Sequence, residues 1–345
     1  MSEDGLTYAA SGVDIQAKDE AAKTITGILS FARQGLGAPL GGAGHFAGMI
    51  EFGEYALVLA TDGVGTKLEV ANALKKWDTV GIDCIAMNVN DAVCVGAEPL
   101  AFVDYLAIDK TDDALVAALA KGLNEGARQS NMTIVGGETA ILPDLVNGFD
   151  LAGTVLAYAK KDRIISGDNI APGDIIIGVT SSGVHSNGYT LVRKSLARAG
   201  INYDDDLGDG RSVGEALIEP TRIYVKAVMD LLAAVPDVKG ISHITGSGLL
   251  NVPRLNKNVR YVLDTPIEAP LVFQQIQKWG GVALDEMYRT FNMGMGLAII
   301  VPAEQADAAL AALKAHWPAQ KVGHVTQGKG VSLPSLNIEI EGAKF

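Results

Sequence analysis

Hydrophobic and polar positions along the first half of the chain predict helices that alternate with strands. Residues 17–34 carry apolar side chains at helical spacing, so we expect an amphipathic helix there. Residues 55–60 form a short apolar run that is typical of a buried strand. The pattern then predicts helices at 79–96 and from Thr111 to about residue 130, and strands at 101–108, 132–135 and 150–159. Thr111, Asp112 and Asp113 would supply a cap and first-turn acids.

The second half continues the same alternation after a polar segment. Residues 161–173, which end in Pro-Gly, mark the best domain boundary, and we divide the chain into units 1–168 and 169–345. The second unit is predicted to contain a strand at 174–180, a helix to about 198, a helix at 221–234 and a strand at 240–245. Strands that alternate with helices in both units indicate mixed α/β domains.

Composition and charge narrow the class of protein. The formal net charge of −12 argues against sequence-independent binding to nucleic acid, which needs a basic surface. Cys84 and Cys94 form neither a metal-ligand pattern nor a disulfide framework, which fits a reducing compartment. The first residues lack an export signal, and no apolar run reaches the roughly 18–20 residues that span a bilayer. We therefore expect a cytoplasmic enzyme with neither nucleic-acid nor membrane partners.

Two glycine-rich segments of the first half are candidates for contact with phosphate. Residues 35–48 match neither common nucleotide-binding glycine pattern, so on their own they are either a flexible connector or a phosphate lid. In TDGVGTK, residues 61–67, Asp62 follows a strand, two glycines allow a sharp turn, and Lys67 adds a positive charge suited to phosphate. The alternative is an ordinary turn between a strand and a helix.

Three acids stand near the ends of predicted elements. Asp91 follows Asn90 inside an apolar helical stretch, where a charge is costly unless it is paired or bound to a metal. It is therefore either a buried cap or ion-pair partner, or a Mg²⁺ ligand. Glu138 in GGET repeats the arrangement seen around Asp62, a strand followed by glycine and a carboxylate. Such oxygen ligands suit Mg²⁺ held together with nucleotide phosphates, but spacing alone does not bring the three acids together.

The second half offers two loops that combine histidine with small polar residues. SSGVHSNG, residues 181–188, lies between a predicted strand and helix, where backbone amides with Ser182 and Ser186 would cradle a phosphate. A solvated loop is the alternative. HITGSG, residues 243–248, has a similar form, and Arg289 and Asn292 precede another predicted strand. A lone histidine is more often structural, so His185 and His243 gain weight only from this shared context.

These segments resemble one enzyme family when they are taken in order. The motifs are TYAASGVDI, DGVGTKL, GID with NVND, GAEPL, VGGETA, SSGVHSNGYTLVR, PTRIYVK, HITGSG and EMYRTFNMGMG. The sequence is similar to phosphoribosylformylglycinamidine cyclo-ligases over roughly residues 7–326. Selenophosphate synthetase, thiamine-monophosphate kinase and a hydrogenase-maturation factor share the acidic and glycine motifs of the first half. They lack the loop SSGVHSNGYTLVR or differ in their cysteines.

The resemblance implies a two-domain α/β PurM-like fold in a homodimer. The sheet of the first domain would pair with that of a second subunit to close a barrel, and a second α/β domain would pack beside it. The implied reaction closes the imidazole ring of formylglycinamidine ribonucleotide to give 5-aminoimidazole ribonucleotide in purine biosynthesis. ATP would phosphorylate the amide oxygen and become ADP, with Mg²⁺ as its metal ion.

The resemblance also assigns roles to individual residues. His185, His243 and Lys67 are expected to act in catalysis, and Asp62, Asp91 and Glu138 to hold Mg²⁺. ATP would contact Gly41, Gly42, Gly44, Asp62, Gly63, Gly65, Thr66, Lys67, Gly136, Gly137 and Glu138. The substrate would contact Ser181, Ser182, Gly183, His185, Ser186, Asn187, Thr245, Gly246, Arg289 and Asn292.

The sequence departs from the family pattern in two places. Ser247 replaces the middle one of three glycines that commonly follow HIT, and the helix start before the family's NIPR motif is shortened here to LLNVPR. A serine would be strained at position 247 if the turn needed a positive φ. The sequence does not decide which histidine moves protons.

Overall fold

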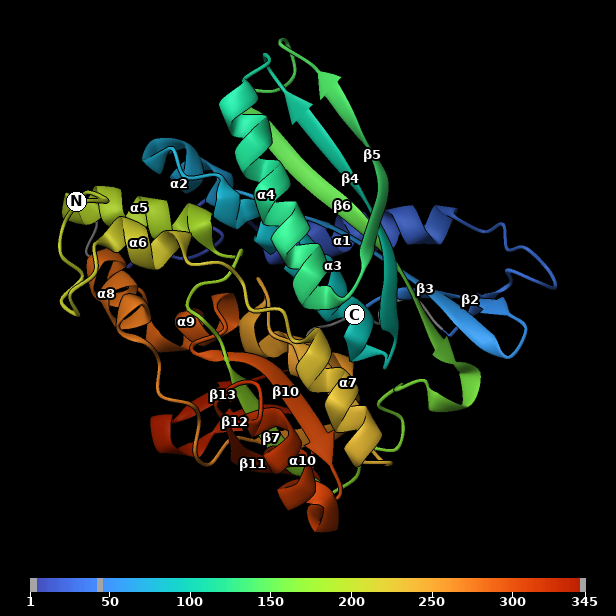
Figure 1. Ribbon diagram of the computed structural model, residues 1–345. Coiled ribbons are helices and arrows are strands. Elements are labelled where there is room, and N and C mark those ends of the chain that lie inside the picture. The colour runs from blue at the N-terminus through green and yellow to red at the C-terminus, as the bar shows by residue number, and fades with distance from the viewer. Residues whose placement is uncertain (1–4, 42–45, 342–345) are drawn as a thin grey trace.

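The computed structural model describes residues 5–41 and 46–341 as two mixed sheets with helices packed between and around them (Figure 1). The first sheet has six strands in the order β1-β2-β3-β6-β4-β5, and the second has seven in the order β13-β12-β9-β11-β7-β10-β8. The expected division at 168/169 falls in the segment that joins the sheets, between Lys160 and Ile175.

The first sheet is antiparallel except at one edge, where β4 and β5 run parallel. Its elements are α1 (Ile15–Ile28), β1 (Pro39–Leu40), β2 (Gly48–Phe52), β3 (Tyr55–Gly63), α2 (Lys67–Leu74), α3 (Asp78–Cys94), β4 (Glu98–Ile108), α4 (Asp113–Ser130), β5 (Thr133–Ile141) and β6 (Phe149–Lys160). The parallel pair follows from the long crossover through α4, because parallel neighbours cannot be joined by a tight hairpin.

Helix α3 lies between the two sheets and is buried along most of its length. It contacts β3 and β6 on one side and β8 and α7 on the other, so it belongs to both cores. Its contact with α4 depends on glycine, because a Cβ on Gly122 would come within 2.0 Å of the Asp78 carbonyl oxygen. Polar side chains on α3 are therefore held in the interior, where each needs a partner.

In the second domain the helices lie in the chain segments that connect the strands of the second sheet. Its elements are η1 (Lys161–Arg163), β7 (Ile175–Thr180), α5 (Tyr189–Ala199), α6 (Val213–Ile218), α7 (Val225–Ala234), β8 (Gly240–His243), η2 (Gly248–Arg254), β9 (Val259–Val262), α8 (Leu271–Gly280), α9 (Leu284–Thr290), β10 (Met295–Val301), η3 (Ala303–Gln305), α10 (Ala306–Lys314), β11 (Ala319–Gln327), β12 (Gly330–Leu333), η4 (Pro334–Leu336) and β13 (Ile338–Ile340). The central strand β10 is buried at every position, as expected of a strand covered on both faces.

One face of the first sheet is covered by helices, and the other is bare. On the covered face Phe102 and Leu106 of β4 are buried, whereas the alternate residues Val103 and Tyr105 are 42% and 44% exposed. Leu59 of β3 has the same orientation as Val103, since both belong to the set that points away from α3, and it is 42% exposed. The bare face thus presents apolar side chains to solvent.

The observed elements differ from the sequence predictions at several ends. Helix α1 stops at Ile28 rather than at 34, and Ile25 and Ile28 are 60% and 74% exposed, so its apolar residues do not reach the core. The cap of α4 is Asp112, whose carboxylate accepts from the amides of Ala114 and Leu115, and not Thr111. Strand β5 runs through GGET instead of ending before it. Within the described residues no helix is both long and apolar enough to cross a membrane.

Candidate active site

A buried ion pair joins the turn after β3 to helix α3 and to the second domain. The Lys67 ammonium lies 2.8 Å from Oδ2 of Asp83, and both side chains are fully buried. Lys67 Nζ also donates to the Glu219 carbonyl oxygen at 2.6 Å. Burial lowers the pKa of Lys67, and the charge of Asp83 opposes that shift. The other oxygen of Asp83 accepts from the amide and hydroxyl of Thr221, at 2.7 and 2.6 Å.

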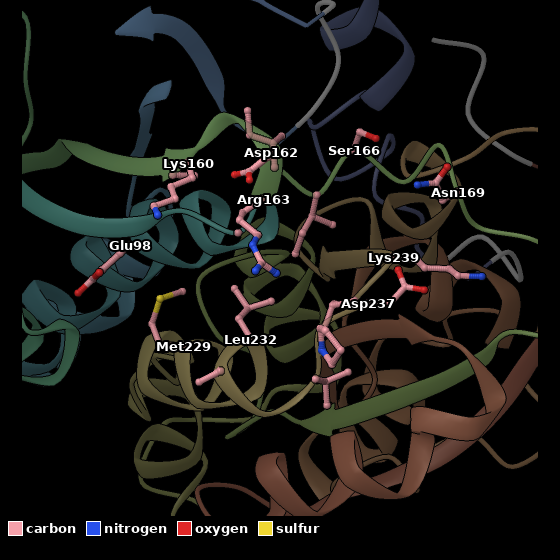
Figure 2. Close-up of a pocket in the computed structure, with 18 of the residues that line it drawn as sticks. Glu98, Lys160, Asp162, Arg163, Ser166, Asn169, Met229, Leu232, Asp237 and Lys239 are labelled. Carbon is pink, nitrogen blue, oxygen red and sulfur yellow. The ribbon is translucent and has the colours of Figure 1, made fainter. Parts of the chain in front are cut away.

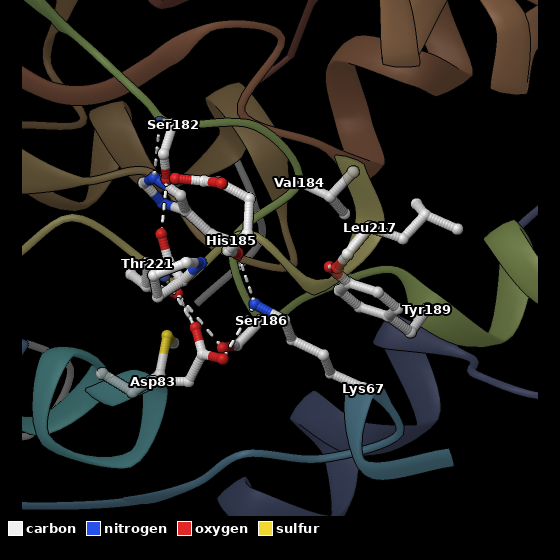
Figure 3. A network of polar contacts seen from close by, with 12 residues as sticks. Lys67, Asp83, Ser182, Val184, His185, Ser186, Tyr189, Leu217 and Thr221 are labelled. Carbon is white, nitrogen blue, oxygen red and sulfur yellow. Dashed lines mark hydrogen bonds and ion pairs between the residues drawn. The ribbon is translucent and has the colours of Figure 1, made fainter. Parts of the chain in front are cut away.

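This network fixes the segment 219–224 of the second domain against the first (Figure 3). Asn90, one residue before Asp91 on α3, donates to the Arg222 carbonyl at 2.8 Å and accepts from the Tyr224 amide at 2.9 Å. The Thr221 hydroxyl lies 3.2 Å from the Ser186 hydroxyl, which carries the network into the loop 181–188. In this structure the Lys67 ammonium is enclosed and bound to two protein partners, and its expected contact with phosphate stays a prediction.

The loop 181–188 is held in shape by Asn292. The side-chain amide of Asn292 donates to the Gly183 carbonyl at 2.9 Å, and its oxygen accepts from the Ser181 hydroxyl at 2.8 Å. Ser182 donates to the Pro220 carbonyl at 2.6 Å. Asn292 and Ser181 are both buried, and their hydrogen bonds hold this loop in place.

His185 lies in this loop, and only one of its two ring nitrogens has a hydrogen-bond partner among the described residues. It has a φ of 64°, an uncommon conformation for a residue with a side chain, and it is 2% exposed. The Ser182 amide donates to Nε2 at 3.2 Å, so the neutral ring carries its proton on Nδ1. In the described part of the chain Nδ1 has no partner. Burial, followed by the nearby charges of His243, Lys67 and Arg222, lowers the pKa of His185 well below its usual value.

His243, at the end of β8, has the complementary arrangement. Its Nδ1 lies 2.8 Å from Oδ1 of Asp91, and an ionised carboxylate only accepts, so Nδ1 donates and Nε2 keeps its lone pair. Within the described residues Nε2 is buried without a partner. The site thus contains one unpaired imidazole donor, on His185, and one unpaired imidazole acceptor, on His243. Unpaired buried polar atoms are uncommon and mark a place where a ligand completes the hydrogen bonding.

Asp62 ends β3 close to this pair. Its Oδ1 accepts from the Gly63 amide at 2.8 Å, and its backbone carbonyl accepts from Asn88 of α3 at 3.1 Å. The residue reaches solvent, but surrounding protein excludes part of the water around the carboxylate. That loss of hydration, followed by the negative charge of Asp91, raises the pKa of Asp62. A cation between the two carboxylates would relieve this repulsion.

Glu138 does not join these acids within one chain. It pairs with Tyr105 across the parallel strands, while Gly137 pairs with Asp104, whose carboxylate lies where a Cβ on Gly137 would stand. Paired residues share a face of a sheet, so Glu138 and Gly136 belong to the bare face with Tyr105. Among the described residues no three acids, cysteines or histidines form a metal-binding group.

The remaining expected residues divide into surface, contact and structural positions. Gly65 has a φ of 71°, as the turn before α2 requires, and the Thr66 and Thr190 hydroxyls lie 3.2 Å apart. Asn187 faces Gly246, where an added Cβ would lie 2.8 Å from the Asn187 side-chain oxygen, and Thr245 accepts from Asn251 at 3.2 Å. Gly41 has a φ of 76°, while Gly42 and Gly44 lie outside the described residues.

Two expectations from the second domain change with the structure. Arg289 donates to the Glu339 carbonyl of β13 at 3.3 Å, so it ties α9 to the edge of the second sheet. Ser247 has a φ of −108°, and the positive φ falls on Gly248 instead, so the serine is not strained. Sequence reasoning gave no role to Asp83, Asn88 and Thr221. The available signal was polar residues inside apolar runs.

We expect Lys67→Met to destabilise the protein without touching the nucleotide. Removing one partner leaves the Asp83 carboxylate buried and uncompensated, which costs on the order of 3–5 kcal/mol. Urea unfolding should report this loss. The double variant Lys67→Met, Asp83→Asn should recover part of the stability and of the activity, because Asn keeps an acceptor for Thr221. If the double variant regained stability but lost all ATP turnover, a direct phosphate contact of Lys67 would be indicated.

Comparison with known proteins shows the family to which this chain belongs. The models for AIR synthase related proteins match at residues 44–159 for the N-terminal domain and 171–334 for the C-terminal domain. A phosphoribosylformylglycinamidine cyclo-ligase of Methanosarcina mazei is 53% identical over 311 residues, covering 90% of this chain and 92% of the relative. That of Thermococcus kodakarensis is 47% identical, covering 97% and 100%. The structure of a hydrogenase maturation protein HypE in complex with ATP is similar with a TM-score of 0.60 at 19% identity, covering 93% and 90%, which shows the shared fold. The chain belongs to the phosphoribosylformylglycinamidine cyclo-ligase family.

Proposed function

We propose that the protein uses ATP to close the imidazole ring of formylglycinamidine ribonucleotide, giving 5-aminoimidazole ribonucleotide, ADP and phosphate. Family membership supports the reaction, and the observation that carries its chemistry is the pair of unsatisfied histidine nitrogens beside Asp62 and Asp91. A ring closure needs both a hydrogen-bond donor for oxygen and an acceptor for the proton that nitrogen loses. The site offers one of each.

The reaction runs in two steps. An amide oxygen is a poor leaving group, so the oxygen first attacks the terminal phosphoryl group of ATP, and the bond to ADP breaks. The neighbouring nitrogen then attacks the activated carbon, loses its proton, and phosphate leaves. Little covalent chemistry is required of the protein, so most of the catalysis comes from positioning and electrostatics.

The two histidines take different roles in this proposal. Nε2 of His243 has a free lone pair and a carboxylate behind the ring, which is the arrangement of a general base, so it accepts the nitrogen's proton. Nδ1 of His185 carries the hydrogen of the neutral ring. The ring does not readily gain a second proton, because burial lowers the pKa of His185. It therefore donates a hydrogen bond to an oxygen of the substrate or of the transferring phosphoryl group.

The residues present fit a magnesium ion that arrives with the nucleotide. Asp62 and Asp91 repel each other and would supply hard oxygen atoms to Mg²⁺, which binds such ligands together with nucleotide phosphates. When bound, the ion neutralises charge on the triphosphate. The glycine segment with Gly41, Gly42 and Gly44 would cover the nucleotide, and Ser182, Ser186 and Asn187 would line the side of the phosphoribosyl substrate.

The bare face of the first sheet supports a homodimer. Leu59, Val103, Tyr105 and Val135 are 42–65% exposed on a sheet whose other face packs against helices. Such a contiguous apolar face is typical of a protein interface. In the proposed dimer the bare face of each copy packs against the bare face of the other, which is an isologous contact. Both apolar faces are then covered, and the two sheets close into a barrel.

Dimerisation gives Glu138 a place in the chemistry. In one chain this carboxylate lies on the bare face, away from Asp62 and Asp91. In the proposed dimer the bare face meets the partner, so Glu138 serves the nucleotide site of the partner subunit. Each of the two sites then contains acids from both chains.

The Asp91→Asn variant should lose ADP and product formation by at least about two orders of magnitude while its unfolding midpoint stays near that of the wild type. The amide still accepts from His243, but the charge that stabilises the protonated ring and the metal is lost. Steady-state ADP release measures the effect. Asp264→Asn is the matched control, because Asp264 makes the same 2.8 Å contact with His324 on the surface. Near-normal turnover in Asp91→Asn would remove Asp91 from the machinery.

Val103→Asp should convert the dimer into a monomer and abolish activity. A charge on the apolar face would be costly to bury in the interface without a partner. Light scattering coupled to gel filtration gives the mass directly. Val116→Asp changes a residue that is 39% exposed on α4, away from the bare face, and should leave the mass unchanged. A wild-type protein that remains a monomer at micromolar concentration would contradict the proposed interface.

Mixing two inactive variants tests whether each site is shared. After Asp62→Asn and Glu138→Gln chains are mixed and allowed to exchange, half of the dimers are mixed, and one of the two sites in each is intact. About a quarter of wild-type activity should return if Glu138 acts across the interface. No recovery, with exchange shown by differently tagged chains, would mean that both acids serve the same chain.

A further inference from the structure

A groove of about 740 Å³ opens between the segment that joins the two domains and helix α7 (Figure 2). Its walls come from the ends of β3 and β6, from residues 162–169, and from α7 with the residues that follow it. It shares no lining residue with the candidate active site. Its size is that of sites for ligands as large as a nucleotide.

The groove lies at the opposite end of the strands from the catalytic residues. Strand β3 enters the groove at Tyr55 and reaches the active site at Asp62, seven residues further, which is about 23 Å along a strand. Strand β8 likewise begins next to Lys239 in the groove and ends at His243. A molecule in the groove therefore does not occupy the nucleotide site.

Two cations of the groove have no ion pair within the described residues. They are Lys160, at the end of β6, and Arg163, in η1. Their backbone is fixed, because the Ile165 amide donates to the Val95 carbonyl at 3.1 Å and Gly96, with a φ of 79°, lets the Arg163 carbonyl approach closely. The Arg163 side chain points from this segment into the groove toward Leu232 (Figure 2).

The other groups of the groove divide into apolar surface and carboxylates. Met229 and Leu232 of α7 form an apolar wall opposite Arg163, and the rings of Tyr55 and Tyr158 lie 5.7 Å apart at one end. Glu98 accepts from the Tyr158 hydroxyl at 3.0 Å, and Lys239 is already paired with Asp174 at 2.7 Å. Asp162 and Asp237 are exposed, as are Lys160 and Arg163, so water and salt screen all four charges while the groove is open.

We propose that this groove binds a small molecule that joins a flat apolar body to a phosphate monoester. The body lies against Met229 and Leu232, and the phosphate lies between Arg163 and Lys160. A guanidinium binds two phosphate oxygens in a fixed fork, and a second cation matches a group that carries nearly two negative charges at neutral pH. Because the walls come from both domains and the segment between them, an occupied groove also stabilises their association.

Binding of 1-naphthyl phosphate to the full-length protein tests the proposal, with ATP held at saturation so that the nucleotide site is filled. We expect saturable binding that raises the unfolding temperature and tightens as pH rises through about 6, where the phosphate becomes a dianion. 1-Naphthol and inorganic phosphate should each bind at least about tenfold more weakly. 1-Naphthoate, which keeps one charge above pH 5, should bind more weakly and show no such pH dependence.

Matched variants separate the groove from general attraction of anions. Arg163→Ala should weaken binding about tenfold or more, whereas Lys161→Ala removes an equal charge two residues away, outside the groove, from a residue that pairs with Glu51. Affinity of Lys161→Ala should stay within about twofold. Equal losses in the two variants, or no saturable binding to the wild type at millimolar probe, would overturn the proposal. The test measures binding of the probe, so its result does not depend on the proposed function. Ring-closing activity of both variants should be unchanged.

Discussion

The Lys67–Asp83 ion pair is the constraint on which the relation of the two domains depends. Two charges lose their water completely at this point, and each is compensated by the other and by backbone groups of residues 219–221. A buried pair of this kind contributes little net stability compared with an apolar replacement, but it tolerates only one geometry. The same segment contacts the loop that carries His185. The position of His185, for which we propose a role in catalysis, is thereby tied to this buried ion pair.

A second constraint comes from the sheet of the first domain. Strand alternation buries one set of side chains under α3 and α4 and leaves the other set apolar and exposed. The acid in GGET belongs to the exposed set. The proposed pairing of two copies would therefore have two effects. It would cover the apolar face, and it would bring the carboxylate of Glu138 to the nucleotide site of the partner subunit.

Local patterns in the sequence predicted most of the elements because helices and strands here follow their hydrophobic periodicity. The α/β class, the strand that carries Asp62 near its end and the loop between β7 and α5 are confirmed. The predictions were wrong where tertiary contacts decide the outcome. Glu138 was expected at the end of a strand, but pairing with β4 extends β5 through both glycines. The ion pair of Lys67 was not foreseen, because its partner Asp83 lies sixteen residues further along the chain and spacing does not reveal that contact.

The histidines show the same limit from the other side. Sequence motifs singled out His185 and His243. Only the hydrogen bonds to Ser182 and Asp91 show that the unpaired nitrogen is a donor in His185 and an acceptor in His243. The tautomer of a histidine is set by what its second nitrogen meets, and that partner is 152 residues away for His243. Roles of this kind are a property of the fold and cannot be read from a motif.

Helix α3 has a consequence for how the molecule unfolds. It packs on β3 and β6 of one sheet and on β8 of the other, and its Asp83 and Asn90 bind the backbone of the second domain. If either half melted alone, this helix would lose its packing and its hydrogen bonds to that half. We therefore expect the two sheets to unfold together in one calorimetric transition, because they share this helix.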